Sequence, residues 1–565
     1  MTEILGQELE KGRIRQLLGR SMSDFPVLAD LDASLSTYHH LTVEKLNELM
    51  RSIAAGCGED LAFLMLKLLQ HEEVGKKSVN DVREKVGNVC NYLLRYLDEK
   101  ERLNDDKIFK WLVSSEHLTP LIDSIIQFDD NKLLVVLLDV LIKAFSEKKY
   151  IDALTDDTIA IIIDKTLPFI DASELIISQR ACSLIESILI KRTLQLHLPV
   201  ILTASMKHYK NQRASEYFIR YTTIIANVMA SSDEHFCACS AMGAVDMIVS
   251  LLKSNDVLVQ MVVLDQVMIS FAHTYAGFEY MFTKGIIKGL ITLACGDISD
   301  GIAPNSLLST QALDLLGNIF AKLGHSLIVN NDANSPLQLL LANNDCQTLL
   351  SSFLQSVVIN INSADDVSKI AGIKSLSEFA SSSFNNFRMV ISDQNVLDCW
   401  INMINSKSDI VAQVLHSIAA VIESKHTIPV GGAAADTAFH RQLKIKLLRS
   451  IEQLKTVSVA TYLIRVIRQP IEDARNGAYN LMRVISNESW GIDMLCNSPS
   501  FLEFICDRNT EFSKDGKEWK FLVIQGLFRH VEFLSPDYVK AITTLHQQGP
   551  FYMPTISGDI LLGEK

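Results

Sequence analysis

Apolar positions recur at helical spacing in two segments that begin at Gly243 and Gly285, 42 residues apart. When the glycines are aligned, five apolar positions of each segment coincide and occupy one face of a helix. These are Ala244, Val245, Ile248, Val249 and Leu251 in the first segment, and Ile286, Ile287, Leu290, Ile291 and Leu293 in the second. The spacing falls within the roughly 40–47 residues of armadillo and HEAT units. It therefore predicts a helical repeat.

A second match joins the middle of the chain to its C-terminal part. Gly277 and Gly491 open similar segments 214 residues apart, which is about five repeats of 43 residues. At this offset Met281, Ile287, Leu290 and Ile291 coincide with Leu495, Phe501, Phe504 and Ile505. The repeat is therefore predicted to continue toward the C-terminus.

The segment from Asp256 to Gly285 predicts the form of one unit. Asp256 is a suitable N-cap for a helix, since its side chain can accept hydrogen bonds from the first-turn N–H groups. The apolar stripe of this helix is Val257, Met261, Leu264, Met268 and Phe271. Gly277 is expected to form a turn, and Gly285 to open the next helix. Such two-helix units cannot bury their apolar faces alone, so they are expected to stack into an all-α solenoid with a groove.

Further apolar segments predict core helices, and two glycine- and proline-containing segments predict inserted loops. The helices are expected over 131–146, 177–190 and 373–380, and the loops near 296–310 and 425–440. Residues 1–35 are expected to be a capping or flexible segment, 36–548 the solenoid, and 549–565 a tail that begins at Gly549-Pro550.

The composition agrees with an all-α chain. Among 565 residues, 48% are apolar and 21% are charged, which excludes a largely disordered chain. There are 25 glycines and 12 prolines, fewer than usual, whereas a β-sandwich or barrel needs many turns.

Net charge and the distribution of cysteines indicate which partners and which cellular compartment to expect. The net charge of −13 argues against nucleic acid as a partner, because nucleic-acid binders neutralise phosphates with a basic face. The 10 cysteines are scattered among apolar residues, as free thiols are in a reducing compartment. The longest uncharged stretch, 346–364, carries too many polar residues to span a membrane, and the N-terminus does not resemble a signal peptide. We therefore expect a soluble, intracellular protein.

No catalytic, cofactor-binding or metal-binding residues are predicted. The sequence carries no phosphate-binding glycine loop and no hydrolase or zinc-protease motif. His235, Cys237 and Cys239 form the one His/Cys cluster, and no second pair follows at the spacing of a zinc site. We therefore expect a protein that is not an enzyme and uses no cofactor.

Local charge predicts a binding surface instead. Seven basic residues and a single acid, Glu452, lie between positions 441 and 468. A basic ridge of this kind can orient docking to an acidic partner, although it can equally be a solvated helix face. Trp490 follows a polar turn and is a candidate interface anchor, with packing between units as the alternative. The predicted partner-binding residues are Arg441, Lys444, Lys446, Arg449 and Trp490.

The C-terminal part resembles a known family, that of 26S proteasome non-ATPase regulatory subunit 5. The resemblance rests on Gln469-Pro470, Trp490, residues 497–501, Asp507-Arg508, residues 514–527, and the ending Gly549-Pro550-Phe551-Tyr552. A weaker match covers residues 264–291, and residues 1–130 are unmatched in detail. The segment 425–440 looks longer than in the family, and Phe551 replaces a tyrosine.

This resemblance implies a HEAT/armadillo-type chaperone for assembly of the proteasome base. Such a protein binds the C-terminal domain of a base ATPase subunit, accompanies a large base scaffold subunit, and leaves before the proteasome is complete. A free monomer is expected, in the cytoplasm and with the nucleus as a second location. The alternative is an unrelated armadillo-type adaptor in transport or tethering.

Overall fold

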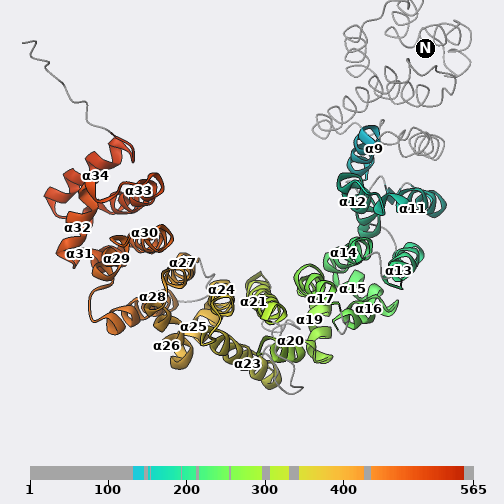
Figure 1. The fold of residues 1–565 in the computed structure, drawn as a ribbon, viewed down its shortest axis with the longest axis horizontal. Helices are drawn as coiled ribbons and strands as arrows, with labels where there is room; N and C mark the ends of the chain where they lie inside the picture. Colours follow the sequence, from blue (N-terminus) through green and yellow to red (C-terminus); the bar gives the residue numbers. More distant parts are fainter. Residues whose placement is uncertain are drawn as a thin grey trace, which may run out of the picture. The chain divides into compact units, whose positions relative to one another are not determined.

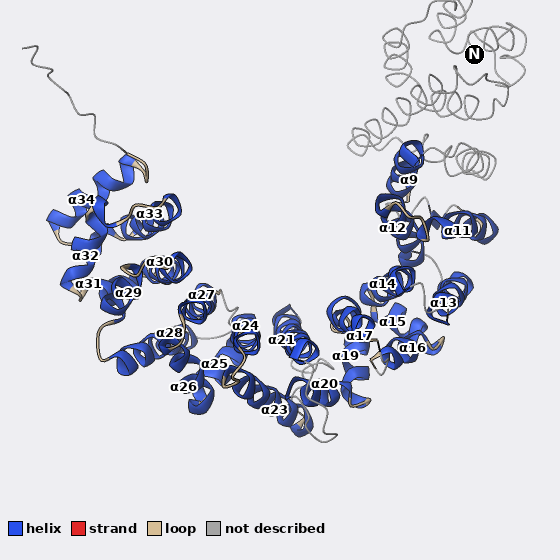
Figure 2. Cartoon of the chain, viewed as in Figure 1, coloured by secondary structure: helices blue, strands red, loops and turns tan. Residues whose placement is uncertain are grey.

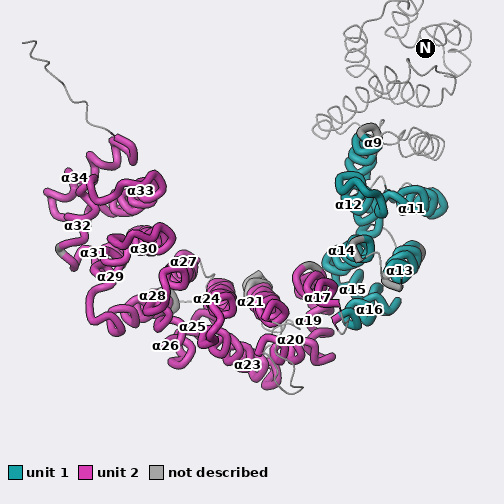
Figure 3. The backbone as a smooth tube through the Cα atoms, in the orientation of Figure 1, with its two compact units in different colours: residues 1–251 teal, residues 252–565 magenta. Residues whose placement is uncertain are grey.

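A computed structural model describes the fold over residues 131–145, 151–152, 154–191, 194–210, 215–252, 256–295, 306–329, 343–424 and 434–552. These residues form helices joined by short connections, and none of them lies in a β-strand (Figure 2). The expected N-terminal segment 1–35 lies outside the described residues. The chain divides into two compact units, 1–251 and 252–565 (Figure 3).

The first unit consists of helices packed in two layers. In one layer α9 contacts α12, and α12 contacts α14, while α11 and α13 cover them from the second layer. The helices are α9 (Asn131–Ala144), α11 (Asp156–Ile170), α12 (Leu175–Lys191), α13 (Leu194–Lys210), α14 (Ser215–Ser231), α15 (Asp233–Ala241) and α16 (Ala244–Leu251). The core helices expected over 131–146 and 177–190 are confirmed as α9 and α12.

The second unit contains a row of helices in which each contacts the next, and we call it the α17–α33 row (Figure 1). Its members are α17 (Val257–Val262) with the continuing π-helix η3 (Val263–Val267) and α18 (Met268–Phe271), then α21 (Ser306–Val329), α24 (Asp366–Ser382), α27 (Ser408–Glu423), α30 (Glu472–Ser486) and α33 (Lys514–Arg529). The expected core helix over 373–380 lies within α24, where Ile373, Leu376 and Phe379 are buried.

A second layer packs along the α17–α33 row. Its helices, again in contact one after another, are α20 (Ile286–Cys295), α23 (Asn344–Ile361), α26 (Gln394–Asn402), α28 (Ala434–Lys455), α29 (Val459–Ile467), α32 (Pro499–Cys506) and α34 (Pro536–Gln548). Short helices α19 (Tyr275–Thr283), α25 (Phe384–Ser392) and α31 (Ser489–Cys496) lead into this layer. The predicted all-α solenoid is confirmed: each helix buries its apolar face against neighbours in both layers.

The two sequence matches correspond to equivalent helices. Helices α15 and α19 begin 42 residues apart, and so do α16 and α20, while α31 begins 214 residues after α19. Gly243 and Gly285 both have positive φ, 80° and 70°, directly before α16 and α20. A glycine is favoured at both positions because other residues are strained in this backbone conformation. The predicted register is therefore correct.

The predicted two-helix unit is wrong in its detail. The repeated unit is a long helix followed by two short ones, as in α14–α15–α16, α24–α25–α26 and α30–α31–α32. Gly277 does not form a turn but lies inside α19, which Thr274 caps through its side chain. A Cβ at Gly277 would lie 2.2 Å from the carbonyl oxygen of Phe271. Glycine is required at position 277 because the backbone of Phe271 comes too close for a side chain. A sequence pattern does not distinguish such a glycine from one that forms a turn.

The expected apolar stripe of the Asp256 helix is also interrupted. Asp256 caps α17 as predicted, with its carboxylate accepting from the N–H groups of Leu258 and Val259. The π-helix at Val263–Val267 then inserts a wider turn and rotates the following residues. Leu264, Met268 and Phe271 are buried, whereas Val257 is 36% exposed.

Helices begin earlier than expected in both predicted loops. α21 begins at Ser306 and α28 at Ala434, inside the ranges 296–310 and 425–440, and the preceding residues lie outside the described part. Gly549 ends α34 with φ of 77°, where the tail was expected to begin. None of the described helices combines the length and apolar character that a membrane span requires.

Candidate partner-binding surface

Small residues let neighbouring helices of the α17–α33 row approach closely. A Cβ on Gly477 of α30 would lie 3.0 Å from the carbonyl oxygen of Ala412 on α27. A Cβ on Gly526 of α33 would lie 2.2 Å from Ser486 Oγ on α30. Because the backbones are this close, side chains beside the contacts reach from one helix to the next.

The first group of such side chains joins α21 to α24. Lys374 Nζ lies 3.1 Å from Asp314 Oδ2 and 3.9 Å from Glu378 Oε1. The Lys374 side chain is 53% exposed, so the group is open to solvent. Burial raises the pKa of Glu378, which the Lys374 ammonium opposes.

The second group joins α27, α30 and α33. Arg483 donates through Nη1 and Nη2 to the two carboxylate oxygens of Glu423, each at 2.7 Å, and to Asn480 Oδ1. Asn480 Nδ2 in turn lies 3.0 Å from His416 Nδ1. The His416 ring is 6.5 Å from that of Trp519 on α33, measured between centroids. We call these five residues the polar stripe of the row.

The electrostatics of the polar stripe depend on a neutral His416. Asn480 Oδ1 accepts from Arg483, so its Nδ2 donates to His416 Nδ1, which must carry no proton. Burial lowers the pKa of His416, and the Asp473 carboxylate opposes this shift more weakly.

This arrangement makes stability depend on pH. The pKa of His416 is lower in the folded protein than its usual value of 6.5. The contribution of neutral His416 to the free energy of unfolding is therefore complete above pH 6.5 and is lost as the pH falls through the lowered pKa. We expect the free energy of unfolding to fall less steeply between pH 7 and 5 in His416→Gln than in the original protein. Urea unfolding at several pH values measures both slopes, and equal slopes would contradict the assignment.

The predicted basic ridge divides into surface and internal residues. Arg441, Lys446 and Arg449 are exposed on α28. Lys446 Nζ also donates to the carbonyl oxygen of Ile391 at 2.9 Å. The Lys444 side chain is only 9% exposed, with Nζ 3.7 Å from Glu488 Oε1, and burial lowers its pKa. Of the four cations predicted to bind a partner, Arg441 and Arg449 are therefore the most open to it.

Trp490 lies in the first turn of α31 and is partly buried. Its Nε1 donates to Glu488 Oε2 at 3.2 Å, and the other oxygen of Glu488 faces Lys444. Glu488 thus joins two of the predicted partner-binding residues, Lys444 on α28 and Trp490 on α31. Lys444 and Trp490 are 46 positions apart in the sequence, so a local sequence pattern does not reveal that they share a partner.

The sequence pattern did not predict the ion pair between Arg475 and the buried Glu511. Glu511, with a side chain 1% exposed, pairs with Arg475 of α30. Its Oε1 also accepts from the N–H groups of Phe512 and Ser513 at 3.0 and 3.2 Å. Burial would raise the pKa of Glu511, but Arg475 and these N–H groups together hold it below its usual value. A Cβ on Gly516 would lie 2.3 Å from this carboxyl carbon, so glycine makes room for the pair.

The cysteines are placed as core residues. Burial raises the pKa of Cys239 to about 12 and that of Cys346 to about 11, which keeps both thiols protonated at neutral pH. No group of three His, Cys, Asp or Glu residues within the described ranges is arranged to hold a metal ion.

The two stacked layers of helices define a helical-repeat protein of the armadillo/HEAT type. The chain belongs to the family described as proteasome non-ATPase 26S subunit, whose sequence profile matches residues 107–299 and 451–557, more than half of the chain. This confirms the family that the C-terminal residues indicated.

Two relatives carry the name 26S proteasome non-ATPase regulatory subunit 5. The human protein is 23% identical over 362 residues, which are 60% of this chain and 63% of the human protein. The bovine protein is 29% identical over 96 residues, which are 16% of this chain and 19% of the bovine protein. Each alignment thus covers less than two thirds of the relative's length.

Among solved structures, yeast importin-β (Kap95p) is similar with a TM-score of 0.47 and 10% identity, over 88% of this chain and 66% of that one. A designed armadillo repeat protein is similar with a TM-score of 0.32 and 11% identity, over 50% of this chain and 98% of that one.

Proposed function

We propose that this protein is a non-catalytic chaperone for assembly of the base of the 26S proteasome regulatory particle. It binds the C-terminal domain of a base ATPase subunit and dissociates before the proteasome is complete. The observation that carries the proposal is the α17–α33 row with its polar stripe, in a chain of the proteasome non-ATPase 26S subunit family.

The geometry of the row supports a binding role. A specific interface needs about 800 Å² from each partner, and several adjacent helices of a solenoid supply a surface of this size. Glu423 is paired with Arg483, and Lys374 with Asp314, and both pairs are partly exposed. A partner with complementary charges can therefore exchange these contacts. Release follows when later subunits compete for the same surface.

The proposed function also specifies the composition of the complex and the cellular compartment. The complex includes a large scaffold subunit of the base beside the ATPase. The free protein is a monomer, without nucleic acid or membrane as a partner. It acts in the cytoplasm, with the nucleus as a second location.

Purification of the tagged full chain under native conditions tests the proposal. We expect mass spectrometry to find base ATPase subunits and the scaffold subunit, at levels well above those in a mock purification. The mature proteasome core particle is expected to be absent. Recovery of no base subunit, or of the complete proteasome in equal amounts, would reject an assembly role.

Charge reversal on the ridge should slow binding of the ATPase subunit. Arg441 and Arg449 are eight positions apart on α28, a little over two turns, and both side chains are exposed. We expect Arg441→Glu with Arg449→Glu to lower the association rate constant roughly tenfold at low salt, and to reduce its salt dependence. Surface plasmon resonance against the recombinant ATPase domain measures both quantities.

A matched control separates the ridge from net charge. Lys288→Glu with Lys540→Glu changes the net charge equally at two other exposed lysines. This control should bind within twofold of the original protein. Equal slowing in both variants, or in neither, would remove the ridge from the interface.

A further inference from the structure

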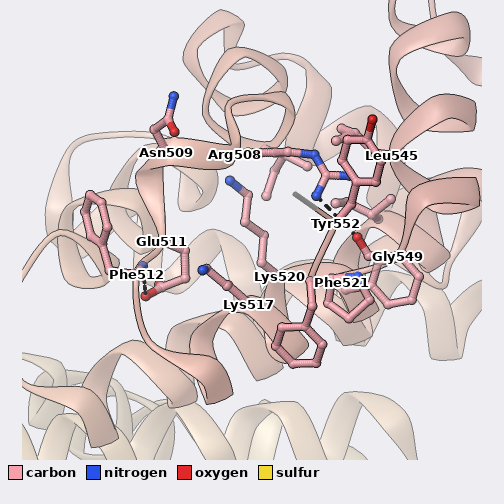
Figure 4. A pocket seen from close by; sticks show the side chains of 14 residues that line it. Arg508, Asn509, Glu511, Phe512, Lys517, Lys520, Phe521, Leu545, Gly549 and Tyr552 are labelled. Carbon is pink, nitrogen blue, oxygen red and sulfur yellow. Dashed lines mark hydrogen bonds between the residues drawn. The ribbon is translucent and has the colours of Figure 1, made fainter. Parts of the chain in front are cut away.

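A cavity of about 420 Å³ lies at the C-terminal end of the second unit (Figure 4). Its apolar floor is formed by side chains from three helices: Ile505 of α32, Phe521 and Ile524 of α33, and Leu545 of α34. Cavities of this size hold small molecules or single side chains of a bound peptide.

Exposed aromatic side chains surround the opening. Phe512 is 84% exposed, Phe551 51% and Tyr552 43%, and all three line the cavity. Large exposed apolar groups that gather around one cavity indicate a contact with another molecule, because scattered single residues are the ordinary case.

The wall that carries Tyr552 is held in place. Gly549 turns the chain at the end of α34, and Arg508 Nη1 donates to the Gly549 carbonyl oxygen at 3.3 Å. Arg508 Nη2 donates to Gln548 Oε1 at 2.8 Å, and the guanidinium carbon lies 5.3 Å from the centre of the Tyr552 ring. A wall fixed in this way loses little freedom on binding, which favours affinity.

The charge of the cavity is positive. Arg508, Lys517 and Lys520 line it, and the one lining acid, Glu511, is already paired with Arg475. Lys520 uses its ammonium internally, donating to the carbonyl oxygens of Phe504 and Asp507 and to Thr510 Oγ1. Lys517 has no carboxylate partner in the part of the chain that the structure describes, and is partly exposed.

We propose that this cavity binds a peptide segment of another protein in which a phenylalanine or leucine is flanked by acidic residues. The phenylalanine or leucine side chain of the peptide enters the cavity, contacts its apolar floor and packs against Phe512 and Phe551. The neighbouring carboxylates meet Lys517 and Arg508. Charge complementarity selects this occupant, because a basic cavity within a chain of net charge −13 favours acidic segments. The proposal does not depend on the assembly role, since it rests on the lining of this cavity and not on the polar stripe or the basic ridge.

Fluorescence anisotropy with the full chain tests the proposal. The probes are two fluorescein-labelled peptides, Gly-Ser-Asp-Glu-Phe-Asp-Glu-Ser-Gly and its leucine counterpart. We expect saturable binding of at least one probe, and at least tenfold weaker binding when the apolar residue is serine or when the acids are amides. If neither probe saturates at 1 mM protein (a limit of roughly 4 kcal/mol of binding free energy), the proposal is wrong.

Variants locate the binding to the cavity. Lys517→Glu and Phe551→Ser should each weaken binding at least tenfold, as loss of an interface anchor does. Lys514→Glu, one turn earlier on α33 and 75% exposed, and Phe533→Ser, 49% exposed, should change it less than twofold. Circular dichroism confirms that each variant is folded. Equal weakening by Lys514→Glu and Lys517→Glu would overturn the proposal in favour of non-specific attraction.

Two further measurements decide between occupants. A chain that stops after Tyr552 should bind the probe within twofold of the full chain. Tenfold tighter binding by the shorter chain would assign the cavity to residues 553–565 of the same chain and overturn the proposal. A dimer in sedimentation that Lys517→Glu dissociates would assign it to a second copy, with the same consequence.

Discussion

Leu290→Asp should lower the free energy of unfolding by about 4–5 kcal/mol, because it places an unpaired charge in a repeat core. Leu290 is 3% exposed on α20, and Ile286, Ile287 and Ile291 of the same helix are also buried. The sequence repeat placed Leu290 on the apolar face, and the structure buries it there. Urea unfolding with thermal melting measures the loss.

Lys288→Asp is the matched control for this prediction. It introduces the same residue two positions away, on the exposed side of α20. An acid in the first turn of a helix is tolerated, so the change should stay within about 0.5 kcal/mol. An unchanged melting temperature in Leu290→Asp would mean that this face of α20 is not packed against the row.

Glu511→Gln should cost about 3–5 kcal/mol, because it leaves the half-buried Arg475 guanidinium without its counter-charge. The Arg475 side chain is 19% exposed and that of Glu511 is 1% exposed, so water screens the pair weakly. Glutamine keeps an oxygen that can accept from the N–H groups of Phe512 and Ser513, so the loss reports mainly on charge. Chemical unfolding at pH 7 measures the effect.

The Arg483–Glu423 pair in the same row of helices is more exposed than the Arg475–Glu511 pair and serves as its control. Arg483 and Glu423 form a bidentate pair with both hydrogen bonds at 2.7 Å, but the Glu423 side chain is 53% exposed. Glu423→Gln should therefore cost less than about 1 kcal/mol. Similar losses in Glu511→Gln and Glu423→Gln would show that burial does not set the strength of the Arg475 pair.

The Glu511 pair also predicts a dependence on acid. Because its folded pKa is lowered, its stabilisation is present above the usual pKa of 4.5 and is lost as the pH falls through the lowered value. The difference in stability between the original protein and Glu511→Gln should therefore shrink on acidification below about pH 4.5. A difference that stays constant down to pH 3 would contradict the paired, ionised carboxylate.

Local periodicity predicted the elements that depend on local sequence. The 42-residue match located α16 and α20, because a buried helix face must repeat apolar residues and Gly243 and Gly285 must adopt positive φ. The same pattern did not distinguish Gly277, where glycine is required by contact with Phe271 rather than by a turn. The local pattern also did not indicate the π-helix at Val263–Val267, because the apolar spacing there predicts a continuous α-helix.

The candidate site was predicted only in part, because its contacts join distant segments. Arg441 and Arg449 are exposed as a ridge requires, but Lys444 turns inward to Glu488, 44 positions further along the chain. A charge pattern counts cations and does not show which of them another helix neutralises. The Glu423–Arg483 pair, 60 positions apart, is likewise visible only when α27 and α30 are packed together.

The sequence alone determined that this chain is an all-α repeat of about 42 residues, since burying apolar faces requires that periodicity wherever the helices stack. It also identified the family through its C-terminal residues. Tertiary structure alone decided which polar side chains form the stripe, the Arg475–Glu511 pair and the C-terminal cavity. The physical reason is that apolar burial follows local spacing, whereas the partner of a charge depends on which helices lie side by side.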